Sequence, residues 1–298
     1  MRILVLGSEG FIGSNAVNFF MRKHYTVYKA DITIKEEPNY FVINPELADF
    51  SSLFSERPYD FCLNATGAAN VQFSIANPAL DFSLNTVNVF HLLSAMRRFN
   101  PHCRFLNLSS AAVYGNPSSL PVSEGAQLLP LSPYGWHKLY SEQICNEFHV
   151  HFGLATKSAR IFSAYGEGLK KQLFWDVYRK IEQARGSEVV LFGTGAESRD
   201  FIYIHDLLEA IECIALNDSF DGKAINIASG TETSIRQVVN EFVLLLQAGS
   251  AVRFSGQVKA GDPANWKADI RVLTTLGFTP QTSIEQGLKN YIQWVKGK

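Results

Sequence analysis

The stretch that decides the fold is Ile3-Leu4-Val5-Leu6-Gly7-Ser8-Glu9-Gly10-Phe11-Ile12-Gly13. Its four apolar residues before the first glycine predict a strand that is buried on both faces. Apolar residues then recur at helical spacing as far as Phe20, which predicts a helix directly after the glycines. A second strand is expected at residues 25–28 and ends at Asp31. A strand, a turn, a helix and a second strand in this order indicate a parallel sheet.

The three glycines suit a turn that binds a dinucleotide. They permit a tight turn, close approach of the backbone to a pyrophosphate, and close packing of the helix on the strand. Asp31 follows Gly13 by 18 residues, near the ~20 at which an acid meets the adenosine ribose. A carboxylate accepts from two ribose hydroxyls and repels a 2′-phosphate, so NAD is preferred over NADP, although Lys29 and Lys35 lie nearby. The alternatives are a plain glycine turn and a solvated acid.

Strands and helices continue to alternate up to about residue 165. Strands are expected at 61–64, 104–108 and 155–161, and helices at 78–99 and 133–152. This pattern predicts an α/β fold with a Rossmann-type, doubly wound parallel sheet over residues 1–165. Residues 166–298 should form a smaller, mostly helical domain, with one strand at 189–192 and helices at 173–184, 205–216, 234–247 and 283–294. The chain is expected to return to the first domain near 200–228.

Composition excludes several classes of protein. The 298 residues are 46% hydrophobic and 18% charged, which argues for a packed core and against disorder. The net charge is −1 with no basic block, so nucleic acid and anionic membranes are poor partners. No apolar run approaches the ~20 residues of a membrane span, and Gly7 comes too early for a signal peptide. Four scattered cysteines predict buried free thiols and a cytoplasmic location rather than disulfides or a metal site.

Tyr134 and Lys138 open a predicted helix after Pro133 and share one helix face, because residues i and i+4 are neighbours. An ammonium beside a phenol favours the phenolate and lowers a pKa that starts near ~10, which suits proton exchange with an alcohol. Ser110 follows the predicted strand 104–108, at the edge where open α/β sheets bind ligands. There it is placed to hydrogen-bond the oxygen whose proton Tyr134 moves. The alternatives are a solvated Tyr–Lys pair and a serine that closes the strand.

In this order and spacing, the glycine turn, Ser110, Tyr134 and Lys138 resemble the extended short-chain dehydrogenase/reductases. Within them the chain is similar to the NAD-dependent nucleotide-sugar epimerase/dehydratase group, which includes the UDP-glucose 4-epimerases. The resemblance runs nearly end to end. It extends to Leu84-Asn85-Thr86-Val87-Asn88, Arg160-Ile161-Phe162-Ser163-Ala164-Tyr165-Gly166, Arg199-Asp200-Phe201-Ile202-Tyr203-Ile204, Asn226-Ile227-Ala228-Ser229-Gly230 and Ala260-Gly261-Asp262-Pro263.

The resemblance implies roles for the residues of the first domain. Tyr134 is implied to be the catalytic acid/base, and Lys138 to tune it and hold the nicotinamide ribose. Ser110 would hydrogen-bond the reacting hydroxyl of the sugar, and Asn85 would lie near the active site. The implied cofactor contacts are Gly7, Gly10, Phe11, Ile12, Gly13, Asp31, Ile32, Ala65, Tyr134 and Lys138.

The second domain is implied to hold a nucleoside-diphosphate sugar. Arg199 matches an arginine that pairs with the diphosphate, as a planar guanidinium can do bidentately; the alternative is an ion pair with Asp200 or Glu197. Two departures from the family pattern leave the nucleotide open, because Ser163 stands where an asparagine is usual and Lys259 where a second arginine is common. The remaining implied substrate contacts are Leu191 and Phe192 for the base and Asp262 for the ribose.

Three reactions fit these residues. A 4-epimerase is favoured, and the alternative is a 4-ketosugar reductase that consumes NAD(P)H. A 4,6-dehydratase is disfavoured, because Ala111 and Ala112 stand where related dehydratases carry an acidic pair. A catalytically idle dinucleotide-binding scaffold is disfavoured by the intact Ser110, Tyr134 and Lys138. The resemblance also implies a homodimer through the helices near 79–96 and 139–152. The sequence does not choose the base or the sugar.

Overall fold

Seven parallel strands form the central sheet of the computed structural model, which describes residues 1–44, 49–184, 186–257, 261 and 263–297. Sheet order reverses beside β1, which pairs with β2 on one side and β4 on the other. This order confirms the doubly wound fold. In sheet order the strands are β3 (Tyr40–Val42), β2 (Thr26–Asp31), β1 (Arg2–Leu6), β4 (Phe61–Asn64), β5 (Arg104–Ser110), β6 (Thr156–Ile161) and β10 (Asp221–Ile227).

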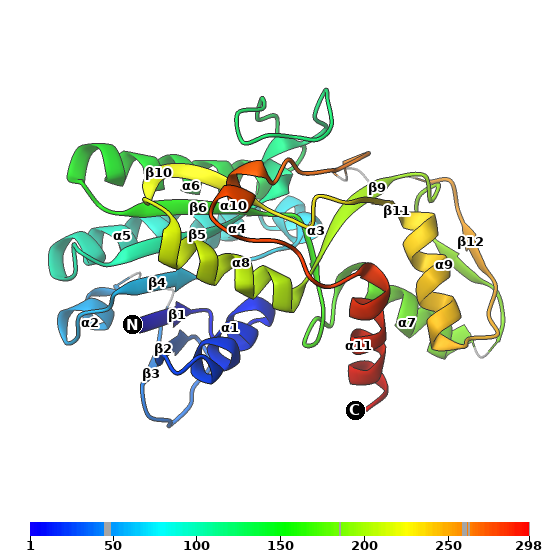
Figure 1. Ribbon diagram of the computed structural model, residues 1–298, viewed down its shortest axis with the longest axis horizontal. Helices are drawn as coiled ribbons and strands as arrows, with labels where there is room; N and C mark the ends of the chain where they lie inside the picture. Colours follow the sequence, from blue (N-terminus) through cyan, green and yellow to red (C-terminus); the bar gives the residue numbers. More distant parts are fainter. Residues whose placement is uncertain (45–48, 185, 258–260, 262, 298) are drawn as a thin grey trace.

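Helices cover both faces of this sheet (Figure 1). The apolar run of β1 explains why, since alternate side chains of a strand point to opposite faces. Ile3 and Val5 pack in one core with residues of α1 (Phe11–Arg22) and α8 (Ile204–Asn217). Leu4 and Leu6 pack in another core, with residues of α2 (Ser51–Ser55), α5 (Asn88–Phe99) and α6 (Pro133–Phe152).

Local signals set the bounds of α6. Ser132 accepts a hydrogen bond from the backbone N–H of Gly135, and Pro133 occupies the first helical position. Gly153 ends the helix in the left-handed conformation with φ of 69°. The expected helix at 78–99 is interrupted in the structure. It consists of α4 (Pro78–Phe82), a π-helical turn (Ser83–Val87) and α5.

We call the central sheet with its covering helices the first lobe, and the part of the chain with two small sheets, of order β11-β9-β7 and β12-β8, the second lobe. The expected helices at 173–184, 234–247 and 283–294 are present, whereas most of these strands were not predicted. All but the six-residue β9 have three residues, and strands this short carry little periodicity. The elements are β7 (Ser163–Tyr165), α7 (Gln172–Ala184), β8 (Val189–Leu191), β9 (Ser198–Tyr203), β11 (Glu232–Ser234), α9 (Ile235–Leu246), β12 (Val252–Phe254), α10 (Arg271–Thr275) and α11 (Ile284–Lys296).

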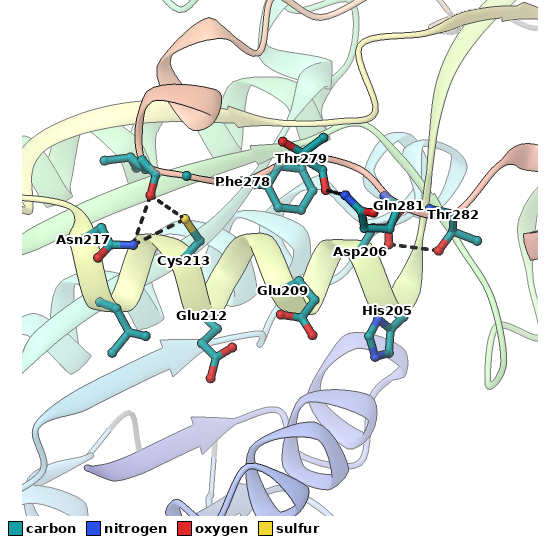
Figure 2. A pocket seen from close by; sticks show the side chains of 13 residues that line it. His205, Asp206, Glu209, Glu212, Cys213, Asn217, Phe278, Thr279, Gln281 and Thr282 are labelled. Atoms are coloured by element: carbon teal, nitrogen blue, oxygen red, sulfur yellow. Dashed lines mark hydrogen bonds between the residues drawn. The ribbon is translucent and has the colours of Figure 1, made fainter.

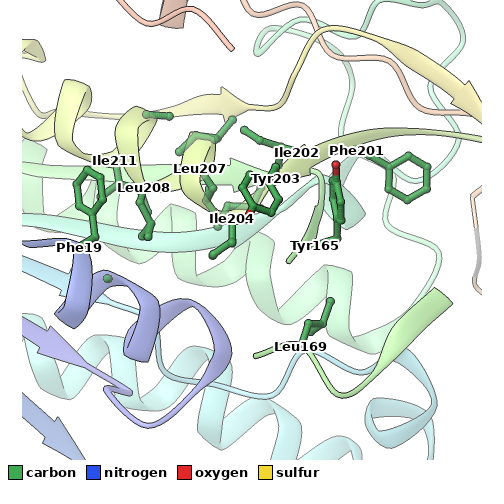
Figure 3. Close-up of a cluster of buried hydrophobic side chains, with 14 of the residues drawn as sticks. Phe19, Tyr165, Leu169, Phe201, Ile202, Tyr203, Ile204, Leu207, Leu208 and Ile211 are labelled. Atoms are coloured by element: carbon green, nitrogen blue, oxygen red, sulfur yellow. The ribbon is translucent and has the colours of Figure 1, made fainter. Parts of the chain in front are cut away.

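The two lobes share one apolar core. Figure 3 shows Phe19 of α1 beside Leu208 and Ile211 of α8, and the same cluster continues through Tyr165 to Phe201 of β9. Burying each such side chain stabilises the fold by about 1.5–3 kcal/mol. The shared core explains why the sequence contains no linker between the halves.

The burial expected for the cysteines is found for three of the four. All four cysteines are free, and Cys62, Cys103 and Cys145 are buried, while Cys213 is half-buried. Among the described residues, no group of three His, Cys, Asp or Glu side chains is placed to hold a metal ion. No helix within the described ranges combines the length and apolarity needed to cross a membrane.

Candidate active site

Several residues singled out in the sequence lie at one edge of the central sheet. β1, β4 and β5 are parallel, so their carboxyl ends lie at the same edge. Gly7 follows β1, Ala65 follows β4, and Ser110 ends β5. The order of strands reverses between β2 and β4, and open α/β sheets bind ligands at such a point.

The glycine turn is shaped for a close backbone approach. Gly7 has φ of +75°, and a Cβ atom there would lie 2.7 Å from the carbonyl oxygen of Ala65. A Cβ atom on Gly13 would lie 1.9 Å from the carbonyl oxygen of Gly7, so only glycine allows α1 to start this close to β1. Gly10 begins α1 without a side-chain cap and no acidic residue follows in the first turn. The exposed N–H groups and positive end of the helix therefore suit a pyrophosphate.

Asp31 lies beside this turn at the end of β2. Its carboxylate accepts from the backbone N–H of Glu9 at 2.9 Å and of Thr33 at 3.2 Å. The two nearby lysines that weaken the preference for NAD are both paired. Lys35 bonds to Glu9 with an N–O distance of 2.6 Å, and Lys29 bonds to Glu37. The next residue, Ile32, is 64% exposed and offers an apolar surface beside the carboxylate.

Tyr134, Lys138 and Ser110 come together as the sequence predicted. Tyr134 and Lys138 lie on the first two turns of α6 and are both buried. The Nζ atom of Lys138 donates to the carbonyl oxygen of Leu108 at 2.9 Å. The Ser110 side chain, two residues further along β5, lies close enough to the Tyr134 phenol to influence its pKa. The end of β5 and the start of α6 therefore form one polar site.

The electrostatics of Tyr134 differ from the prediction. Burial raises the pKa of its phenol to about 12, the negative charge of Asp81 adds to that rise, and the Ser110 side chain opposes it. Lys138 is not among the groups that shift this pKa, so the expected lowering by its ammonium is not observed, and the loss of hydration on burial has the largest effect. Burial also lowers the pKa of Lys138 to about 8, while Asp81 and Glu142 oppose that shift.

Asn85 also faces this site, from the π-helical turn between α4 and α5. π-helical turns often mark functional positions. The Nδ2 atom of Asn85 donates to the carbonyl oxygen of Ala68 at 3.1 Å, whereas its Oδ1 atom is buried without a partner among the described residues. A Cβ atom on Gly67 would lie 2.3 Å from that Oδ1 atom and 3.4 Å from Nζ of Lys138. The three residues therefore border one small space that holds an unused acceptor.

A buried chain of polar side chains supports the site, and the sequence analysis missed it. Asn64 of β4 donates to Asn107 of β5 at 2.9 Å, and Asn107 donates to Ser141 of α6 at 3.0 Å. The Ser141 hydroxyl in turn donates to the carbonyl oxygen of Lys138. The asparagines inside the apolar strands at 61–64 and 104–108 could have indicated this chain in the sequence, because buried polar groups need hydrogen-bond partners.

A second missed feature is a buried acid that packs against α6. The Oδ2 atom of Asp81 lies 2.5 Å from Nδ1 of His137, which neighbours Lys138 in the chain. The carboxyl side chain is fully buried. Its negative charge adds to the rise in the pKa of Tyr134 and opposes the fall in the pKa of Lys138, so it belongs to the electrostatics of the site.

Arg199 and Ser163, two of the residues expected to contact substrate, lie on neighbouring strands of the small sheet β11-β9-β7. Nη1 of Arg199 donates to the carbonyl oxygens of Ser198 and Ala264. The Asp200 carboxylate accepts from Ser229 and from the N–H of Ala268 instead. The two residues expected at the base differ in exposure, since Leu191 is buried in the core and Phe192 is 54% exposed. Lys259 and Asp262 lie outside the described residues.

A hollow of about 500 Å³ lies elsewhere, between α8 and the segment 276–282 (Figure 2). It contains His205 and Asp206. The Asp206 carboxylate accepts from the backbone N–H groups of Gln281 and Thr282 and from the Thr282 hydroxyl. Asp206 therefore ties the segment before α11 to the start of α8.

Comparisons with known proteins agree with this geometry. A putative UDP-glucose 4-epimerase of Methanocaldococcus jannaschii is 28% identical over 99% of this chain and 98% of its own length. UDP-glucuronic acid decarboxylase 1 of Xenopus tropicalis is 27% identical over 99% of this chain and 72% of its own. The crystal structure of UDP-glucuronic acid 4-epimerase from Bacillus cereus, in complex with UDP-glucuronic acid and NAD, is 26% identical. It superposes with a TM-score of 0.88 over 100% of this chain and 99% of that one.

The sequence profile of the NAD dependent epimerase/dehydratase family matches residues 3–228. This range runs from β1 to β10 and includes Asn85, Ser110, Tyr134 and Lys138. The chain belongs to the NAD-dependent epimerase/dehydratase family.

Proposed function

We propose that this chain is an NAD-dependent epimerase that inverts C4 of a UDP-sugar through a 4-keto intermediate. The observation that carries the proposal is the meeting of Ser110, Tyr134, Lys138 and Asn85 beside a glycine turn at the edge of the sheet. The names of the relatives, which include 4-epimerases of UDP-glucose and UDP-glucuronic acid, support the choice of nucleotide and reaction.

The residues present fit NAD. The glycine cradle, which a Cβ atom would fill at Gly7 or Gly13, and the uncapped start of α1 suit the pyrophosphate. Asp31 would hold the adenosine ribose and Lys138 the nicotinamide ribose. When bound, the cofactor supplies the acceptor and donor of the hydride at the sugar carbon. The residues expected to complete its binding surface are Gly10, Phe11, Ile12, Ile32 and Ala65.

Tyr134 is the proposed acid/base of the reaction. Its phenolate oxygen takes the proton of the C4 hydroxyl as C4 loses its hydride, and returns the proton when the ketone is reduced on its other face. Ser110 lies beside the phenol and would hold the same substrate oxygen. A phenol with a pKa of about 12 needs positive charge close by to ionise near neutrality. The Lys138 ammonium and the oxidised nicotinamide would supply that charge.

The nucleotide sugar is proposed to lie between the two lobes. We infer that residues 1–165, together with the returning segment 200–228, hold the cofactor and that 166–298 hold the nucleotide. Arg199 would bind the diphosphate and the exposed ring of Phe192 would meet the base. The other proposed contacts are Ser163, Leu191, Lys259 and Asp262.

Dehydration is not part of the proposal. Ala111 and Ala112 follow Ser110, and the Ala112 N–H donates to the Ser110 hydroxyl oxygen at 3.2 Å. Two methyl groups cannot move the protons that elimination of water requires. Hydride transfer needs neither position, because Ser110, Tyr134 and Lys138 suffice for it.

A homodimer is proposed to form through α5 and α6. Aromatic side chains lie partly exposed along these helices and the end of α4, and their rings are in contact. Phe82 and Trp136 both lie against Tyr140, and Phe90 lies against Phe148. Exposed apolar surface of this kind is typical of protein interfaces.

The test mixes purified protein, substoichiometric NAD and one nucleotide sugar at a time in D₂O, and follows the products by NMR. UDP-glucose, UDP-glucuronic acid and UDP-N-acetylglucosamine are compared with GDP-, CDP- and dTDP-sugars. We expect the C4 epimer of a UDP-sugar, formed over many turnovers without deuterium at C4. Consumption of NADH with a 4-ketosugar and no epimer would identify a reductase instead. Release of carbon dioxide from UDP-glucuronic acid would identify a decarboxylase.

A further inference from the structure

Trp266 lies between Arg199 and the loop that follows β5. The centre of its indole ring is 5.3 Å from the guanidinium carbon of Arg199, within the range of a cation–π contact. Its indole N–H donates to the carbonyl oxygen of Gly115 at 3.0 Å. The side chain is only 8% exposed, and the Phe162 ring packs edge-on against it. One buried ring therefore contacts the arginine of β9 and the loop after β5.

The backbone around Trp266 is fixed to both lobes. We call residues 264–268 the clasp, which lies between β12 and α10 (Figure 1). On the side of the second lobe, the backbone N–H of Trp266 donates to the carbonyl oxygen of Ser198. The backbone N–H of Ala268 donates to the carboxylate of Asp200. On the sheet side, Ala264 N–H donates to Oδ1 of Asn116 at 2.7 Å. The clasp thus bridges β9 and the loop after Ser110 at several points.

The hydrogen bond from Trp266 ends on the turn that carries Ser110. Residues Ala111–Tyr114 form a 3₁₀ turn that Ser110 begins and Gly115 ends. Gly115 has φ of +61°, and a Cβ atom there would lie 2.0 Å from the carbonyl oxygen of Leu129. Packing therefore leaves this end of the turn little freedom to move. The indole N–H holds one end of a short turn whose other end is the proposed substrate-binding serine.

We propose that Trp266 is a positioning residue that fixes the Arg199 guanidinium relative to the Ser110 turn. This inference rests on the proposed function. A diphosphate bound by Arg199 would then be held at a set distance from Ser110 and Tyr134, which places the sugar carbon for reaction. Misplacement of a reacting group by about 1 Å can cost on the order of 100-fold in rate, so a rigid link between the two sites has a measurable consequence.

The two contacts of Trp266 can be separated by substitution. Trp266→Phe keeps an aromatic face under Arg199 but removes the N–H that holds Gly115. Trp266→Leu removes both. Trp294→Phe, in α11, is the matched control for the loss of an indole. Each variant is also made in the Arg199→Ala background, so that coupling between the two positions is measured directly.

The experiment measures UDP binding by calorimetry and kcat and KM with the UDP-sugar that the wild type converts. Trp266→Leu should weaken UDP binding by roughly 2- to 30-fold, the range of a cation–π contact. The loss should disappear in the Arg199→Ala background. Trp266→Phe should keep the UDP affinity to within about 3-fold while kcat falls by roughly 2- to 10-fold, as expected for a lost hydrogen bond. Trp294→Phe should match the wild type.

Two results would overturn the inference while the proposed function stands. One is an equal loss of UDP affinity on Trp266→Leu with and without Arg199, and the other is an unchanged kcat in Trp266→Phe. NAD binding by each variant reports whether the first lobe is intact. If Trp266→Leu does not fold, the separation of kcat from UDP affinity in Trp266→Phe decides the question. A wild type that binds neither UDP nor another nucleoside diphosphate would overturn the proposed function and this inference with it.

Discussion

The ammonium nitrogen of Lys138 lies 2.9 Å from the carbonyl oxygen of Leu108, so the helix that carries Tyr134 is joined to the strand that ends in Ser110. This hydrogen bond fixes a lysine whose charge is held inside the protein. Burial lowers its pKa to about 8, close to the pH at which the enzyme would work. The same burial raises the pKa of Tyr134 to about 12. These shifts favour a protonated phenol at neutral pH and make Lys138 easier to deprotonate than an exposed lysine.

Tyr134→Phe should lower kcat by roughly 100- to 10,000-fold, the usual contribution of a general acid/base. The phenylalanine ring fills the same buried space, so the fold and NAD affinity should stay close to those of the wild type. Turnover is measured with the UDP-sugar found above, and NAD binding by calorimetry. Retention of more than about a tenth of the wild-type rate would show that another group moves the proton.

Lys138→Met should change how stability depends on pH. Because the folded pKa of Lys138 is lowered from 10.5 to about 8, the unfolded chain holds more protons than the folded chain between these values. The free energy of unfolding of the wild type should therefore rise relative to the variant as pH increases through this window, by on the order of 3 kcal/mol at most. Denaturant unfolding at pH 7.5, 8.5 and 9.5 measures the difference. A constant difference would contradict the lowered pKa.

Asp31→Asn should reduce the preference for NAD over NADP. The amide keeps an acceptor for the Glu9 N–H but removes the charge that repels a 2′-phosphate. NAD affinity should fall by roughly 10- to 100-fold, the range of a charge-assisted hydrogen bond. Glu9→Gln should raise NADP affinity, because it releases Lys35 from its ion pair. Both cofactors are titrated against each protein, and tighter binding of NADP by the wild type would refute the assignment of Asp31.

Gly13→Ala should destabilise the fold and abolish NAD binding. Its Cβ atom would lie 1.9 Å from the carbonyl oxygen of Gly7, so α1 must move away from the turn. Overpacking of this kind costs about 1–3 kcal/mol. Gly125→Ala is the matched control, because a Cβ atom there has no neighbour within 4 Å. Thermal unfolding and NAD titration should distinguish the two variants, and equal behaviour would mean that the turn is looser than described.

Phe90→Asp should dissociate the proposed dimer. Phe90 is 44% exposed on α5 within the aromatic surface proposed as the interface. Leu244→Asp is the control, since Leu244 is 75% exposed on α9 in the other lobe. Sedimentation velocity should give a dimer for the wild type and the control, and a monomer for Phe90→Asp. A monomeric wild type at micromolar concentration would rule out the interface.

The local elements of this protein were determined by its sequence. The apolar run of β1, the glycines and the helix α1 act between near neighbours, so their pattern is sufficient to predict them. The same holds for α6, where Ser132, Pro133 and Gly153 supply the cap, the first turn and the stop. The meeting of Ser110, Tyr134 and Lys138 also followed from the sequence, because parallel strands bring their ends to one edge.

Tertiary structure decided what depends on burial and on distant contacts. The pKa of Tyr134 rises although Lys138 shares its helix face, because desolvation depends on everything packed around the phenol and not on one neighbour. Leu191 is buried and Phe192 exposed, a distinction that adjacent apolar residues cannot reveal. Trp266 joins Arg199 and Gly115, which are 67 and 151 residues away along the chain. No local pattern encodes such a contact, since it exists only when the chain returns to the sheet and three separate segments pack against one another.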